Sequence, residues 1–91
     1  MRRPGFVLVP QMWREELIAM KASGTVWNVA VELLRRARFS PVVKLTNEAA
    51  AKIGISRQAK WLALNRLRLR GLIAIGSRSG ASPKVRVCYL D

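Results

Sequence analysis

Hydrophobic positions recur every three or four residues in four segments of the chain, which is the spacing of one face of an α-helix. The segments predict helices over residues 10–22, 26–38, 47–53 and 57–70. The second segment is apolar nearly all round, a pattern typical of a central, buried helix. Trp13 and Trp27 fall on apolar positions of the first two segments, and we expect both in the core.

Residues that favour helix ends stand beside these segments. Hydroxyl side chains cap helix starts because they accept a hydrogen bond from a free backbone N–H. Glycine favours helix ends because it adopts the left-handed conformation without strain. The predicted caps are Thr25, Thr46 and Ser56, and the predicted ends are Ser23-Gly24, Gly54 and Gly71.

Short β-rich runs lie between and after the helical segments. Residues 6–9, 42–45 and 72–75 are predicted strands, and residues 84–90 alternate with period two. Residues 76–83 are small and flexible, so residues 72–90 predict a β-hairpin with a basic tip.

The charge of the chain changes the picture most. Its 91 residues fit one domain, with 17 Lys+Arg against 5 Asp+Glu and a net charge of +12. Between Glu48 and Asp91 there is no acidic residue. A surface of one sign repels itself, and a polyanion relieves that repulsion. A surface that serves only solubility is the alternative, and we favour the polyanion.

Two stretches carry a family resemblance. The run Leu45-Thr46-Asn47-Glu48-Ala49-Ala50-Ala51-Lys52-Ile53-Gly54-Ile55-Ser56-Arg57-Gln58 resembles a helix-turn-helix. The run Leu64-Asn65-Arg66-Leu67-Arg68-Leu69-Arg70-Gly71-Leu72-Ile73 resembles the end of a recognition helix and the first wing strand of winged-helix transcription regulators. The resemblance implies a single winged helix-turn-helix domain over residues 1–91, mainly α with a small β-hairpin wing. The helix-turn-helix would span about 46–70 and the wing about 72–90.

Packing within the helix-turn-helix is consistent with the residue types present. Gly54 suits the tight turn, and the small Ala50 lets the two helices approach closely. The space between the helices would be filled by Ile53, Ile55, Leu64 and Leu67.

The outward face of the fourth helix is the predicted reader of DNA bases. Arginine suits guanine, and asparagine or glutamine suits adenine, in the major groove. The predicted base-contacting residues are Arg57, Gln58, Trp61, Asn65 and Arg66. Trp61 suits core anchoring equally well. Leu62 and Leu69 fall on the same side; Leu62 suits a thymine methyl group, but for both we favour packing under the wing or the first strand.

A second group is predicted to contact the DNA backbone. Helix N-termini attract phosphates, and basic hairpins follow the backbone or the minor groove. The predicted contacts are Thr46, Asn47, Ser56 and Lys60, with Arg78, Ser79, Lys84 and Arg86 in the wing. Lys60 stands where similar motifs have an aliphatic residue, so we expect its stem at the edge of the core and its ammonium group at a phosphate.

Other classes of function fit poorly. The chain has no histidine and one cysteine, Cys88, so neither histidine-based catalysis nor a zinc site is expected. We expect no enzyme activity, no cofactor, no bound metal and no membrane segment, and a cytoplasmic, nucleoid-associated protein. Duplex DNA is the expected partner, and the expected role is that of a transcription regulator or of an accessory factor in replication or recombination. Such proteins often bind as dimers, so the protein could act as a homodimer. The alternatives are a basic RNA- or ribosome-associated protein and a protein–protein adaptor on the same fold.

Overall fold

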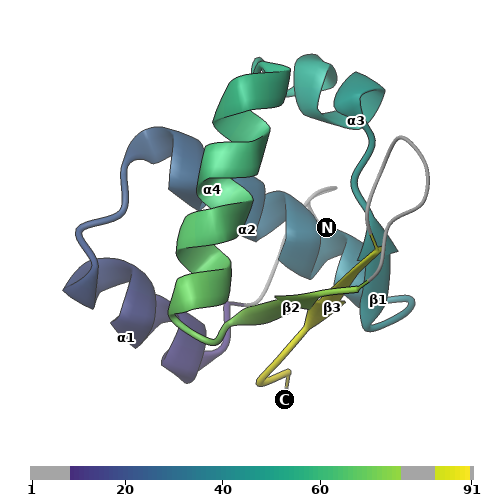
Figure 1. The fold of residues 1–91 in the computed structure, drawn as a ribbon. Coiled ribbons are helices and arrows are strands. Elements are labelled where there is room, and N and C mark those ends of the chain that lie inside the picture. Colours follow the sequence, from purple (N-terminus) through teal and green to yellow (C-terminus); the bar gives the residue numbers. More distant parts are fainter. Residues whose placement is uncertain (1–8, 77–83, 91) are drawn as a thin grey trace, which may run out of the picture.

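Four helices and a three-stranded sheet make up the described part of the chain, residues 9–76 and 84–90 of the computed structural model (Figure 1). The helices are α1 (Gln11–Ala19), α2 (Gly24–Ala37), α3 (Asn47–Lys52) and α4 (Arg57–Leu69). The strands are β1 (Val42–Lys44), β2 (Ile73–Ile75) and β3 (Lys84–Val87). The prediction of a mainly helical domain with a small sheet is confirmed.

The core lies between α2, α4 and the sheet. α2 is buried along most of its length and packs against α4, β1 and β3 (Figure 1). Leu33, Leu64 and Val85 are fully buried, one from each of these layers. Trp13 of α1 is also fully buried, and its indole nitrogen donates to the carbonyl oxygen of Cys88 at 2.6 Å. Trp27, also expected in the core, is only partly buried against it.

Hydroxyl side chains start three of the helices. Thr46 accepts from the backbone N–H of Ala49 at 3.0 Å, and Ser56 accepts from that of Ala59 at 3.1 Å, as predicted. The predicted cap at Thr25 is wrong, because Ser23 accepts from the N–H of Val26 and α2 begins at Gly24. Gly24 therefore starts α2 instead of ending α1.

Three helices end in the same backbone motif. A residue with positive φ follows each helix, and two backbone hydrogen bonds close the last turn. Gly54 (φ 77°) and Gly71 (φ 77°) occupy this position after α3 and α4, as predicted. After α1 the position belongs to Lys21 (φ 53°), with Ala22 N–H donating to Leu17 O at 3.0 Å. α1 therefore ends earlier than the sequence predicted.

The sheet is antiparallel with strand order β1-β3-β2. β1 pairs with β3 through Val42↔Arg86 and Lys44↔Lys84, a pairing that the sequence did not predict. β3 stops at Val87, and Tyr89 has a φ of 56°, so the predicted strand over 84–90 is shorter in the structure. Val43 and Val85 point into the core, whereas the alternate residues are exposed.

One predicted strand falls almost wholly outside the described residues. Residues 6–8 of the predicted run 6–9 are not described, and Val9 belongs to no strand. Most of the predicted loop over 76–83 also lies outside them.

Candidate nucleic-acid interface

The short helix α3 and the longer α4 form one packed unit. Ala50 of α3 is fully buried, and its carbonyl oxygen accepts from the N–H of Ile55 at 2.9 Å, which closes the turn at Gly54. Ile55 is buried as expected, and Ile53 is partly buried. Along α4, Leu64 and Leu67 are fully buried, so the opposite face of the helix is left at the surface.

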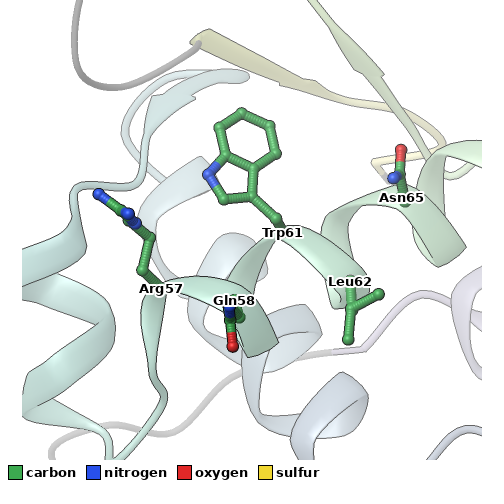
Figure 2. Close-up of a pocket in the computed structure, with 5 residues that line it drawn as sticks. All are labelled: Arg57, Gln58, Trp61, Leu62 and Asn65. Carbon is green, nitrogen blue, oxygen red and sulfur yellow. The ribbon is translucent and has the colours of Figure 1, made fainter.

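That exposed face carries a shallow depression with a volume of 360 Å³. Five residues of α4 line it: Arg57, Gln58, Trp61, Leu62 and Asn65. Figure 2 shows them in two rows, with Arg57, Trp61 and Asn65 on one side of the helix and Gln58 and Leu62 on the other. Four of the five predicted base-contacting residues are therefore brought together.

The fifth, Arg66, lies away from the depression. Its guanidinium group donates to the carbonyl oxygen of Met20 at 3.2 Å, so it leans towards the end of α1. One turn further on, Arg70 forms an ion pair with Glu16 of α1 at 2.9 Å. These two arginines join the C-terminal half of α4 to α1.

Asn65 is held by a neighbour that the sequence analysis did not select. The guanidinium group of Arg68 donates to the side-chain oxygen of Asn65, at 3.2 and 3.4 Å. The contact fixes the orientation of the amide and adds a positive charge beside it. The three-residue spacing on one helix face was the available signal.

Lys60 is fully buried, so the expectation that its ammonium group lies at the surface is wrong, and the predicted phosphate contact is without support in this structure. The group donates to the carbonyl oxygen of Leu45 at 3.1 Å and lies 5.4 Å from the ring centre of Trp61. Burial lowers the pKa of Lys60, and the nearby charge of Arg57 lowers it further. Lys60 therefore links α4 to the residue that follows β1, and its ammonium group contacts the ring of Trp61.

The position of Trp61 is consistent with both roles predicted for it, core anchoring and contact with a base. Its side chain is partly buried against the core, yet it also lines the depression (Figure 2). The indole lies near the Lys60 ammonium group and is partly exposed, so anchoring and contact with a ligand are compatible.

The predicted phosphate contacts at the helix starts differ in accessibility. The hydroxyl oxygens of Thr46 and Ser56 accept the capping hydrogen bonds, which leaves each O–H able to donate. Asn47 is half-buried, and within the described residues its side-chain oxygen is buried without a hydrogen-bond partner. The side-chain oxygen of Asn47 therefore faces the interior of the protein.

The exposed face of the sheet adds three cations. Lys84 and Arg86 project from β3, as predicted, and Lys44 projects from β1 directly opposite Lys84. Like charges in directly opposite positions destabilise a sheet. The sequence analysis missed Lys44, because its place depends on the pairing of β1 with β3. Arg78 and Ser79 lie outside the described residues.

The two leucines on α4 are exposed, contrary to the packing that we expected. Leu62 is 66% exposed and Leu69 is 73% exposed. Leu62 lines the depression, whereas Leu69 lies two turns further on and does not.

The acidic side chains that form ion pairs in the described residues, Glu16 and Glu32, both belong to the first half of the chain. Glu32 is buried and accepts from Arg35 and Arg36, each at 2.6 Å. Burial alone would raise the pKa of Glu32, but the hydrogen bonds and charges of the two arginines lower it overall. In residues 9–76 and 84–90, the ion pairs involve Arg35, Arg36 and Arg70 only.

The described part of the chain contains neither a cluster of metal-ligand side chains nor a membrane-spanning helix. No group of three or more acidic, cysteine or histidine side chains is placed to hold a metal ion there. None of the helices in that part is long and apolar enough to cross a membrane. No protein-family model, curated protein or solved structure matched the chain.

Proposed function

We propose that the protein binds duplex DNA sequence-specifically through a winged helix-turn-helix domain. In this proposal α3 and α4 are the helix-turn-helix, α4 enters the major groove, and β2 and β3 form the wing on the backbone or minor groove. The observation that carries it is the exposed face of α4, where Arg57, Gln58 and Asn65 line one depression.

Each side chain then has a chemical role. Arg57 lies in the first turn of α4 and suits the two acceptors of guanine. Gln58 and Asn65 suit adenine, and Arg68 keeps the Asn65 amide in a fixed orientation. Lys44 and Lys84 lie at the end of the sheet nearest the start of α3, where they suit phosphates beside the groove.

The biological setting follows from the proposed ligand. A protein of this kind acts as a transcription regulator, or as an accessory factor in replication or recombination, on the nucleoid in the cytoplasm. As a homodimer it would bind two half-sites about one helical turn apart. Neither catalysis nor a cofactor is part of the proposal.

A protein–protein adaptor is the second candidate, and the exposure of Leu62 and Leu69 favours it. However, Arg66 and Arg68 lie between these leucines in the helix and are exposed themselves. An apolar partner surface would have to take up these charges, so we favour DNA.

Fluorescence anisotropy tests the proposal with a labelled random duplex of about 25 base pairs, long enough for two helical turns. The titration is repeated over a salt series, with an RNA hairpin of equal length as competitor. We expect affinity to fall steeply with salt and the RNA to displace little protein. Displacement by the RNA would favour the RNA-associated alternative, and weak binding to both nucleic acids would favour the adaptor.

Sequence specificity needs a second step with a duplex selected from a randomised library. Arg57→Ala should reduce the preference for the selected duplex over random DNA by about 10-fold, the order of one bidentate guanine contact. Arg38→Ala is the matched control, because Arg38 is also exposed but lies at the end of α2. Equal losses on both duplexes for Arg57→Ala would contradict base recognition by this residue.

A further inference from the structure

We infer that Leu62 reads the methyl group of a thymine, so that the preferred duplex contains a thymine beside an adenine contacted by Gln58. The inference rests on the proposed function, since it assumes that α4 lies in the major groove. It adds one chemical requirement to the DNA site, which is a methyl group at a defined position. A contact to a phosphate or to the hydrogen-bonding edge of a base would not need this group.

The position of Leu62 in the depression carries the argument. Leu62 is flanked by Gln58 four residues before it and Asn65 three residues after it, and all three line the same depression (Figure 2). Gln58 and Leu62 lie in one row, and four residues of helix rise about 6 Å. Stacked bases are about 3.4 Å apart, so the two side chains would address bases within about two steps.

The exposure of Leu62 is not explained by the fold. The core side of α4 is already filled by Ala63, Leu64 and Leu67, each at most 1% exposed. Leu62, at 66% exposed, adds little to that packing. Thymine is the only base that presents a methyl group in the major groove, and apolar side chains are its usual contacts. Polar neighbours on both sides of Leu62 would take the hydrogen-bonding edges of the adjacent bases.

The charges around the depression favour DNA over an apolar protein partner at this place. Arg57 lines the same depression as Leu62, and Arg68 donates to Asn65 beside it. A hydrophobic partner would offer no hydrogen bond to the guanidinium group of Arg57 or to the amide of Gln58. A base pair offers acceptors, donors and a methyl group within the width of one depression.

Replacement of thymine by deoxyuracil tests the inference, because uracil lacks only the methyl group. The preferred duplex is selected from a randomised library, and each thymine is then replaced in turn. We expect the wild-type protein to lose about 4-fold in affinity at one thymine, the order for one methyl group removed from an apolar contact. Leu62→Ala should bind the thymine duplex more weakly and lose nothing further with uracil.

Leu69→Ala is the matched control, since it removes the same side chain from an exposed position of the same helix outside the depression. It should keep the full sensitivity to uracil. If selection yields a preferred duplex but no thymine matters, or if Leu62→Ala and uracil give independent losses, the inference is wrong and the proposed function stands. If no duplex is preferred over random DNA, the proposed function fails, and the inference fails with it.

Discussion

Lys60 offers a direct test of how the buried charge contributes to the fold. Lys60→Met keeps an unbranched stem but removes the ammonium group. The variant then loses one charge-assisted hydrogen bond to Leu45, about 1.5–3 kcal/mol, and the contact with Trp61, about 2 kcal/mol for a desolvated ammonium group. It is also relieved of a buried charge, whose desolvation costs several kcal/mol.

These opposing effects should nearly cancel. We expect Lys60→Met to change the free energy of unfolding by less than about 2 kcal/mol near neutral pH. Lys60→Ala also removes the stem from a fully buried site, and the cavity should cost about 2–5 kcal/mol. Urea unfolding followed by tryptophan fluorescence measures both variants. A Met variant as unstable as the Ala variant would refute the reasoning, because the ammonium group would then be the main stabilising part.

The pH dependence provides an independent test. The pKa of Lys60 is lowered from its usual 10.5, first by burial and then by Arg57. Between the lowered pKa and the usual value, the unfolded chain binds the proton more fully than the folded protein does. Stability therefore rises with pH in that window, and it lacks this gain below the lowered pKa. Lys60→Met should lose this rise relative to the wild type, whereas Lys52→Met, on an exposed lysine of α3, should keep it.

Binding to DNA gives the same residue a third readout. A lysine that contacts a phosphate contributes about 0.9 to the slope of log affinity against log salt. Because its ammonium group is buried, Lys60→Met should leave the slope unchanged. A reduction by about 0.9 would show that the group reaches a phosphate in the complex, as the sequence alone suggested.

The remaining predictions concern other elements of the fold. Lys21→Gly should raise the free energy of unfolding by about 1 kcal/mol, measured by urea unfolding, because a non-glycine residue at φ 53° is strained; no gain would contradict the strain. The two arginines lower the pKa of Glu32. Its contribution to the free energy of unfolding is therefore present above the usual pKa of a carboxyl group and is lost as pH falls through the lowered value. Glu32→Gln should flatten that part of an acid-unfolding curve, and an unchanged curve would refute the role of the arginine pair. Lys44→Gln should raise the melting temperature most at low salt, since it removes a like-charge cross-strand pair, and an equal rise at all salt concentrations would argue against repulsion.

The parts of the fold that local signals determine were predicted well. Thr46, Ser56, Gly54 and Gly71 lie where the sequence placed them, because caps and left-handed ends depend on neighbouring residues only. The predicted start of α2 was wrong because two hydroxyl residues, Ser23 and Thr25, lie close together there and no local rule ranks them as caps. Lys21 gave no signal at all, since a lysine rarely takes the place of glycine at a helix end.

The parts that depend on contacts between distant residues were missed. Lys44 belongs to the basic sheet face only because β1 pairs with β3, and no local pattern reports that pairing. The spacing of Lys60 from Leu64 and Leu67 is that of a core position, yet its charge argued for the surface. Its buried partner is the carbonyl oxygen of Leu45, fifteen residues earlier in the chain. In contrast, the outward face of α4 followed directly from helical periodicity, although Arg66 does not line the depression.

The charged residues that form ion pairs within the fold differ from the cations of the proposed interface. The ion pairs of the described residues join α1 to α4 and stabilise the last turn of α2, so they use Glu16 and Glu32. The exposed cations Arg57, Lys44 and Lys84 form no ion pair in that part of the chain. Single substitutions at these three positions should therefore leave the fold intact, because they remove repulsion and not partners. The same lack of partners leaves their charges available to the phosphates and bases of a duplex.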